Sequence, residues 1–279
     1  MTHLLRYLQI MIGQDFAGYT ITRKLTNGGM TQLYVAVDRS QHRVVLRRLK
    51  PDYVRDRRIR NSFLHGAEIL NKIHHPNVVR LIKAGLFQDE PFMALEYVEA
   101  KNLRDLILNK SPLLYQNVLT MFRQMAAAIN YVHQMGFWHL DFKPENLIVR
   151  DDGLIILVDF DLALERKPKP VKLSPLPGTF AYLPPESLTK SLVDDQTDIF
   201  SFGVTCYEIL TGRKPFEGVT PDDAKRNQVD PNIRPMRLSL HNVRVPIQLE
   251  TLIFKCLAKR QEERYPSTSL IVRDLETMV

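Results

Sequence analysis

Hydrophobic and polar residues alternate along the first third of the chain, which is typical of half-buried β-strands. Residues 19–49 contain three such stretches, YTITRKL, QLYVAVD and HRVVLRRL, separated by the turn sequences NGG and DRSQ. Two further strands are predicted by VVRLIKAGLF and PFMALEYV. Between the two groups, residues 58–73 place apolar side chains at every third or fourth position, which predicts a helix. The first third is therefore expected to be a β-rich unit with one main helix.

The periodicity changes after residue 99, where apolar side chains recur at helical spacing. The stretches with this spacing are 103–108, 115–135, 198–210 and 249–258. An exception is the pair of short apolar runs NLIVR and LIILVDF, which an Asp-Asp-Gly turn joins into a predicted hairpin. The chain is thus predicted to be α+β, with an N-terminal extension at 1–17 able to form a short helix, a small lobe at 18–98 and a larger helical lobe at 99–279.

Composition agrees with a folded globular chain, because 44% of the 279 residues are hydrophobic and 25% are charged. The net charge of +7 permits an acidic partner, and much of it comes from two clusters at residues 55–60 and 166–172. No aromatic residues interleave with either cluster, as base stacking would require, so nucleic-acid binding is not expected. A solvated basic surface is the simpler interpretation.

Neither disulfide chemistry nor a membrane segment is predicted. Cys206 and Cys256 each lie among apolar residues, and no C-x-x-C or Cys/His cluster occurs, so a disulfide or a structural metal is not expected. The apolar run at 154–158 is far shorter than the roughly 18 residues that a transmembrane helix needs. No small-residue cleavage site follows the apolar N-terminal residues, so no signal peptide is expected. The interpretation is a reduced, cytoplasmic protein.

The residues best suited to chemistry lie in one short polar segment, HLDFKPEN, at 139–146. Asp141, Lys143 and Asn146 stand at i, i+2 and i+5 in a proline-containing loop between a predicted helix and the hairpin. Such a loop can direct a carboxylate base, a cation and an amide oxygen toward one point. Asp159 follows at the exit of the second hairpin strand and offers another oxygen ligand for a divalent cation. Either segment alone would fit a solvated turn, but the two in this order favour a functional site.

With these segments the chain resembles the eukaryotic-like Ser/Thr protein kinases, especially their bacterial branch, over about residues 18–274. HLDFKPENL is similar to the catalytic loop, VDFDLA to the metal-binding Asp-Phe-Gly motif, and GTFAYLPPE to the end of the activation segment, which here spans 159–186. DIFSFG matches the helix whose Asp198 braces the catalytic loop, and Glu186 with Arg264 matches the ion pair that fixes the segment's end. The resemblance implies a bilobal protein kinase fold.

The resemblance also implies a role for each polar residue of the loop. Asp141 would orient a protein hydroxyl and accept its proton, while Lys143 would steady the γ-phosphate of ATP. Asn146 and Asp159 would hold Mg²⁺. The implied cofactors are ATP and Mg²⁺, and the implied partner is a protein, either a substrate or a binding partner.

The implied nucleotide site draws residues from both predicted lobes. EYVEAKNLRDL resembles the hinge, with Leu95 as gatekeeper and the backbones of Glu96 and Val98 against adenine. The nucleotide-binding residues that the resemblance implies are Leu25, Gly28, Gly29, Leu33, Val45, Arg47, Leu95, Glu96, Val98 and Ile148.

The chain departs from the kinase pattern where the nucleotide is held. Thr26 and Thr31 replace the first and third glycines of the glycine-rich loop, and a β-branched residue opposes the close approach that glycine permits. Arg47 replaces the phosphate-binding lysine, and a planar guanidinium is a poor substitute for a compact ammonium. Val45 replaces a small alanine beneath adenine. Gly66 stands where the helix glutamate that pairs with the lysine is expected.

Two further departures affect the on/off switch. Leu140 replaces the arginine that usually receives a phosphate on the activation segment, and Asp161 replaces the glycine of Asp-Phe-Gly. All the departures together favour a pseudokinase with weak or no phosphoryl transfer and residual ATP binding. An active atypical Ser/Thr protein kinase that uses Arg47 is an alternative, because Asp141 and the metal-binding residues are intact. A scaffold that binds no nucleotide is the second alternative.

Overall fold

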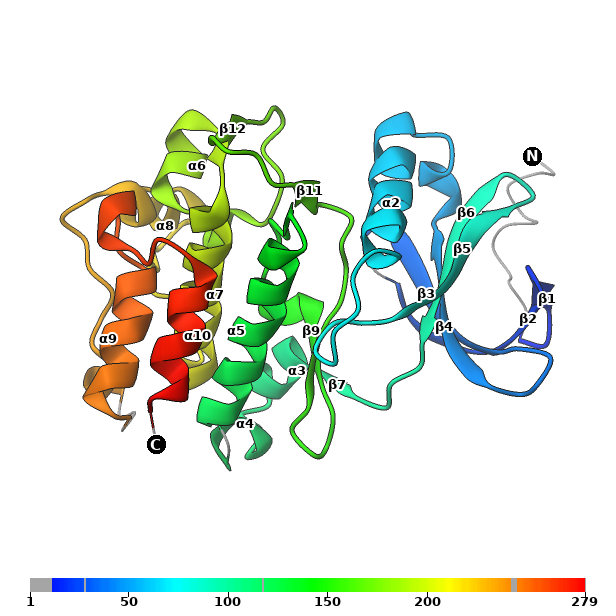
Figure 1. Ribbon diagram of the computed structural model, residues 1–279, viewed down its shortest axis with the longest axis horizontal. Coiled ribbons are helices and arrows are strands. Elements are labelled where there is room, and N and C mark those ends of the chain that lie inside the picture. The colour runs from blue at the N-terminus through cyan, green and yellow to red at the C-terminus, as the bar shows by residue number, and fades with distance from the viewer. Residues whose placement is uncertain (1–11, 28, 117, 242–244, 279) are drawn as a thin grey trace. The chain divides into compact units, whose positions relative to one another are not determined.

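Figure 1 shows the computed structural model, which describes residues 12–27, 29–116, 118–241 and 245–278. The chain divides into two units, one of Met1–His74 with Val79–Glu99 and the other of His75–Val78 with Ala100–Val279. In the described residues the first unit is mostly sheet and the second mostly helix. The predicted α+β fold class is therefore confirmed.

The first unit is built on a six-stranded antiparallel sheet with the order β1-β2-β3-β4-β6-β5. Its strands are β1 (Asp15–Phe16), β2 (Tyr19–Asn27), β3 (Thr31–Val37), β4 (Arg43–Leu49), β5 (Leu81–Phe87) and β6 (Glu90–Glu96). Tyr19, Ile21, Tyr34, Leu46 and Phe92 contribute to one buried apolar cluster. Successive residues of a strand point to opposite faces, so this one-sided cluster is the physical origin of the alternating sequence pattern.

Helix α2 (Arg57–Leu70) packs against this sheet with Phe63 and Ala67 buried (Figure 1). Asp56 is its N-cap, and the carboxylate accepts hydrogen bonds from two backbone N–H groups of the first turn. This cap offsets the repulsion between the arginines of that turn and the positive end of the helix. The helix predicted over 58–73 ends earlier, at Leu70, and the buried Ile73 lies just beyond the turn that follows.

The second unit is organised around α7, nearly all of whose residues are buried. Its helices are α3 (Leu103–Leu108), α4 (Leu113–Gln116), α5 (Val118–Gln134), α6 (Pro185–Lys190), α7 (Asp195–Thr211), α8 (Pro221–Val229), α9 (Ile247–Cys256) and α10 (Thr268–Glu276). A Cβ added to Gly203 of α7 would lie 2.7 Å from the Cβ of Cys256 on α9, so glycine is what allows the two helices to approach this closely. Cys206 and Cys256 are free thiols in this core.

Short strands connect the helices of the second unit. They are β7 (Lys101–Asn102), β8 (Phe137–Trp138), β9 (Leu147–Val149), β10 (Ile155–Leu157), β11 (Leu164–Glu165), β12 (Val171–Lys172) and β13 (Leu192–Val193). Strands β9 and β10 form the predicted hairpin, with Leu147 opposite Leu157. The pairs β8–β11 and β12–β13 have two residues a strand, too few for a sequence pattern to reveal them.

None of the helices in the described ranges is both long enough and apolar enough to cross a membrane.

Candidate functional site

The catalytic-loop sequence begins directly after β8, and Asp198 of α7 fixes its backbone. The Asp198 carboxylate is fully buried, accepts the backbone N–H groups of His139 (2.9 Å) and Leu140 (2.8 Å), and contacts Nε2 of His133 (2.8 Å). Leu140 has a left-handed backbone, with φ of 61°, which few non-glycine residues adopt without support. The hydrogen bonds to Asp198 supply that support and set the direction in which the loop leaves the strand.

Asp141, Lys143 and Asn146 are brought together by this loop. The Nζ atom of Lys143 lies 2.7 Å from Oδ2 of Asp141 and donates to the Thr179 hydroxyl over 2.7 Å. The Asn146 amide donates to both the carboxylate and the backbone carbonyl of Asp141, each over 2.8 Å. The Thr179 hydroxyl in turn donates to Oδ1 of Asp141 over 3.3 Å. Asp141 is therefore an oriented carboxylate, held on both oxygens and still 12% exposed.

The backbone segments that carry Asn146 and Asp159 are adjacent, because the N–H of Val158 donates to the Asn146 carbonyl over 2.8 Å. The Asn146 amide nitrogen is committed to Asp141, which leaves the amide oxygen as the atom able to bind a cation. Mg²⁺ prefers oxygen ligands and commonly takes only one or two from the protein, with the rest from phosphate and water. This donor pair fits a Mg²⁺ ion that arrives with phosphate. No group of three or more metal-ligating side chains occurs within the described ranges.

His139 contributes packing rather than charge. Its ring is fully buried and lies edge-on to Phe160, with 4.9 Å between the ring centroids. Burial lowers the pKa of His139 below its ordinary value, although the carboxylates of Asp198, Asp141 and Asp159 oppose this effect. A neutral imidazole thus anchors Phe160, and with it the Asp-Phe-Asp sequence at the start of the activation segment.

The end of the activation segment is tied to the second unit at two places. The Arg264 guanidinium is fully buried and forms a two-pronged pair with Glu186, at 2.6 and 2.9 Å. Gly178 has φ of 94°, and a Cβ there would lie 2.7 Å from the carbonyl oxygen of Leu140. Glycine at 178 therefore allows the segment to pass directly over the catalytic loop, which places Thr179 beside Asp141.

Leu140 lies in a small apolar cluster. The buried members are Trp138, Leu140 and Val193, and the partly buried ones are Leu164, Val171, Leu173 and Leu176. The four partly buried members all belong to the activation segment. Where the kinase pattern has an arginine that receives a phosphate, this chain has an apolar contact with the segment itself.

Arg47 of β4 is buried, with its guanidinium carbon 5.3 Å from the ring centroid of Phe63 on α2. Gly66 is buried one turn further along the same helix. Glu68, which carries the only carboxylate of α2, is 71% exposed and lies 3.7 Å from His65. The contribution of α2 to the surroundings of Arg47 is therefore an aromatic ring and not a carboxylate.

The segment between β2 and β3 that corresponds to the glycine-rich loop is described only in part, since Gly28 lies outside the described residues. Lys50 restrains the described half: its ammonium donates to the carbonyl of Gly29 over 2.8 Å. Leu25 is 38% exposed and Leu33 is partly buried. The turn is thus tied to the end of β4 by a cation that the sequence analysis did not select.

The residues expected near adenine fall on strands β4, β6 and β9 and on the segment after β6, and they belong to both units. Val45 and Leu95 are direct partners on β4 and β6, and Leu95 is 7% exposed. The backbone N–H of Glu96 donates to a carbonyl of the segment before β5 over 3.0 Å, which fixes the end of β6. Val98, in the first unit, and Ile148, in the second, are both partly buried.

Two sets of contacts around this site were missed by the sequence analysis. The first set is made by Thr179 with Lys143 and Asp141, and the Gly-Thr pair of GTFAY is the sequence feature that could have indicated it. The other centres on Arg104 of α3, which donates to Glu145 (2.9 Å) and Glu208 (2.8 Å) and also contacts the Tyr182 hydroxyl. Burial and the Glu208 carboxylate raise the pKa of Tyr182, so its hydroxyl stays protonated and donates to Glu208. No local pattern links residues this far apart along the chain.

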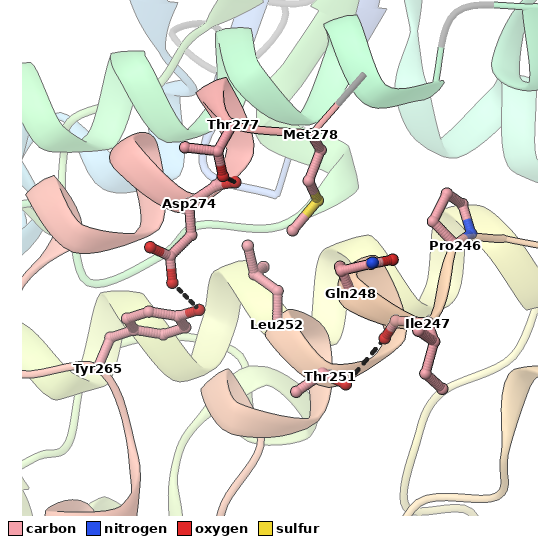
Figure 2. Close-up of a pocket in the computed structure, with 9 residues that line it drawn as sticks. All are labelled: Pro246, Ile247, Gln248, Thr251, Leu252, Tyr265, Asp274, Thr277 and Met278. Atoms are coloured by element: carbon pink, nitrogen blue, oxygen red, sulfur yellow. Dashed lines mark hydrogen bonds between the residues drawn. The ribbon is translucent and has the colours of Figure 1, made fainter.

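A pocket of about 500 Å³ lies elsewhere in the second unit, between α9 and α10 (Figure 2). Its lining residues are Pro246, Ile247, Gln248, Thr251, Leu252, Tyr265, Asp274, Thr277 and Met278. The Tyr265 hydroxyl donates to Asp274 over 2.8 Å at its edge. The lining includes none of the catalytic-loop residues, so this pocket is separate from the candidate site.

Known proteins are similar to this chain over nearly its whole length. The sequence model of the protein kinase domain family matches residues 19–274. A probable serine/threonine-protein kinase of Clostridium acetobutylicum is 30% identical over 272 residues, which is 96% of this chain and 41% of that protein. The serine/threonine-protein kinase PrkC of Bacillus subtilis is 29% identical over 271 residues, or 96% of this chain and 42% of that protein. The chain thus spans about two fifths of the length of these relatives.

Solved structures share the fold. The crystal structure of the Mycobacterium tuberculosis PknI kinase domain gives a TM-score of 0.72 at 23% identity, covering 96% of this chain and 99% of that one. At this level of identity the likeness shows the bilobal kinase fold and carries no further assignment.

Proposed function

The chain belongs to the protein kinase domain family, and we propose that it binds ATP with Mg²⁺ and slowly transfers the γ-phosphoryl group to Ser or Thr hydroxyls of a protein substrate. The observation that carries this proposal is the arrangement of Asp141, Lys143, Thr179 and Asn146, in which one carboxylate is oriented by an ammonium, a hydroxyl and an amide. These contacts hold the carboxylate as a general base for a hydroxyl group requires.

The residues of the chain act mainly by positioning and charge. Asp141 orients the attacking hydroxyl and accepts its proton, and its contact with Lys143 holds the carboxylate in position. Asn146 and Asp159 would hold the metal through one amide and one carboxylate oxygen. When bound, ATP–Mg²⁺ supplies the phosphoryl group and the divalent charge that neutralises its oxygens.

The proposed slow rate follows from the residues that are expected to hold the nucleotide. Arg47 lies beside the ring of Phe63, and α2 offers no carboxylate at Gly66 to position a cation on the phosphates. Two or three lost contacts of about 1.4 kcal/mol each would slow transfer by roughly 10²–10³-fold. Weak ATP binding and slow turnover therefore have one physical cause.

Single-turnover transfer of γ-phosphate to a mixture of generic protein substrates, with ATP affinity measured with and without Mg²⁺, tests the proposal. Asp141→Asn should abolish transfer and leave ATP affinity nearly unchanged, because Asp141 contacts the hydroxyl and not the nucleotide. Asp152→Asn is the matched control, since it removes an exposed carboxylate from the hairpin turn. Transfer that survives Asp141→Asn would refute the proposal.

A pseudokinase that binds nucleotide without transfer is the second candidate, and the Arg47 and Gly66 substitutions favour it. The same experiment separates the candidates. ATP binding with no transfer sensitive to Asp141→Asn identifies the pseudokinase, and the absence of binding at millimolar ATP identifies a nucleotide-free scaffold.

A further inference from the structure

The first turn of α7 begins with two adjacent carboxylates that make different contacts. Asp194 is the N-cap, and its side chain accepts the backbone N–H of Gln196 over 2.9 Å. Asp195 instead accepts the indole N–H of Trp138 (2.6 Å) and the Nε–H of Arg166 (2.8 Å) on Oδ1, and its Oδ2 contacts Nη2 of Arg166. Because Asp194 already caps the helix, the Asp195 carboxylate is available to bind Trp138 and Arg166.

The two partners belong to the two segments that must be ordered for phosphoryl transfer. Trp138 ends β8, directly before the catalytic loop, and Arg166 directly follows β11 in the activation segment. Strands β8 and β11 pair with Leu164 opposite Trp138, and the backbone N–H of Arg166 donates to the Gly136 carbonyl over 2.8 Å. Nη1 of Arg166 donates to the His133 carbonyl over 2.8 Å. One carboxylate on α7 thus connects both segments to the most buried helix of the unit.

The electrostatic setting keeps this carboxylate charged. Burial raises the pKa of Asp195, but the hydrogen bonds from Arg166 and Trp138 outweigh burial and hold the pKa below its ordinary value. The pairing with Arg166 is two-pronged, and the position at the start of a helix favours negative charge. Asp195 is therefore an anion at neutral pH without any modification.

We propose that Asp195 is a positioning residue that keeps the activation segment and the catalytic loop ordered in the unphosphorylated chain. In kinases switched by phosphorylation, a phosphate added to the segment pairs with arginine and orders it. Here the charges are reversed, because the segment supplies the arginine and the helix supplies a permanent anion. The effect on turnover rests on the proposed function, whereas the ordering itself can be measured in a chain that transfers no phosphate.

The cluster around Leu140 adds a second, uncharged anchor further along the segment. Val171 pairs with Val193 between β12 and β13, and the backbone N–H of Leu173 donates to the Ser191 carbonyl over 2.9 Å. These strands bring the apolar side chains of the segment onto Leu140. Both anchors consist of groups that are always present, so ordering requires no phosphate.

Hydrogen exchange on the whole chain tests the proposal, after phosphatase treatment and with intact mass showing no phosphate. We expect the amides of residues 164–173 to be protected in this form. Asp195→Asn should speed their exchange by about tenfold or more, as the loss of a charge-assisted pair predicts. Arg166→Gln, which leaves α7 unaltered, should give at least the same increase, since it also removes the hydrogen bond to the His133 carbonyl. Asp222→Asn is the matched control, because it removes a first-turn carboxylate from α8 and should change nothing.

The single tryptophan of the chain supplies a spectroscopic readout, since Trp138 itself donates to Asp195. Both Asp195→Asn and Arg166→Gln should shift its emission, and the control variant should not. Where transfer is measurable, Asp195→Asn should lower kcat about tenfold and leave the KM for ATP unchanged, because Asp195 positions the loop and does not touch the nucleotide.

Three results would overturn the proposal. The first is that residues 164–173 exchange equally fast in Asp195→Asn and in wild type. The second is that this segment exchanges rapidly in wild type until it is phosphorylated. The third is that Arg166→Gln fails to reproduce the effect of Asp195→Asn. A chain that transfers no phosphate yet shows the expected protection would refute the proposed function and leave this inference standing.

Discussion

Replacing Leu140 by arginine restores the residue that the kinase pattern places before the catalytic aspartate, and we expect it to destabilise the second unit. Leu140 is 1% exposed, and its neighbours in the cluster are apolar side chains of β8, β13 and the activation segment. The two carboxylates that contact its members already have partners, since Asp195 binds Trp138 and Arg166 and Asp198 accepts backbone N–H groups of the loop. The arginine would thus exchange water for largely apolar surroundings without a carboxylate of its own, and no phosphate-controlled switch would result.

The magnitude follows from two contributions. Burial of a leucine side chain contributes about 1.5–3 kcal/mol, of which the arginine methylene groups recover a part. A buried guanidinium without a carboxylate of its own adds a penalty of several kcal/mol. The left-handed backbone, with φ of 61°, strains leucine and arginine alike, so it cancels. The free energy of unfolding should therefore fall by about 3–5 kcal/mol, which lowers the melting temperature by roughly 6–20 °C.

Urea denaturation followed by the fluorescence of Trp138 measures this loss, because the only tryptophan lies in the same cluster. Leu140→Met is the matched control, since it keeps the volume and should cost less than about 1.5 kcal/mol. Leu140→Ala isolates the cavity and should cost about 2–5 kcal/mol. If Leu140→Arg stays within about 1 kcal/mol of wild type, as a surface substitution would, the cluster is not a closed apolar contact and the reasoning is refuted.

Three further outcomes are expected. Arg47→Lys alone should change ATP affinity, measured by calorimetric titration, by less than about threefold. Arg47→Lys combined with Gly66→Glu should improve the affinity by more than the sum of the two single effects, and additive effects would contradict the coupling between the two positions. Ser174→Glu should leave any transfer activity and the segment's hydrogen exchange unchanged, because Leu140 cannot bind an anion; strong activation would contradict this. Burial lowers the pKa of His75, whose Nδ1 accepts the N–H of Asn77 over 3.1 Å. The neutral His75 side chain should therefore stabilise the fold above the ordinary histidine pKa of 6.5, and this contribution should decline as the pH falls below 6.5. Urea denaturation at pH 7.5 and 5.5 checks this against His75→Gln, in which that part of the decline should be absent.

The strands and the catalytic loop could be predicted from the sequence, because their signals are local. Alternation along β2, β3 and β4 reflects one buried face, and the spacing of Asp141, Lys143 and Asn146 within a single loop already limits how far apart they can lie. Helix ends were less predictable, as Ile73 shows: it continues the apolar pattern of α2 and is buried, yet it lies beyond the last helical residue.

The tertiary contacts of the site could not be predicted, since nothing in a local pattern encodes them. Arg104 and Glu208 meet although 104 positions separate them, and either could equally be a solvated surface charge. Asp194 and Asp195 are chemically identical neighbours, and only the folded chain shows that the first caps α7 and the second binds Arg166.

Gly178 constrains how this sequence can diverge. Any side chain there would meet the Leu140 carbonyl at 2.7 Å in a backbone conformation, φ of 94°, that disfavours every residue but glycine. This constraint concerns the path of the chain and is independent of phosphoryl transfer. In descendants of this sequence, Asp141 can drift once the reaction is no longer selected, while position 178 stays glycine for as long as the loop is retained. The order in which the two positions change along a lineage would therefore separate the loss of activity from the loss of the fold.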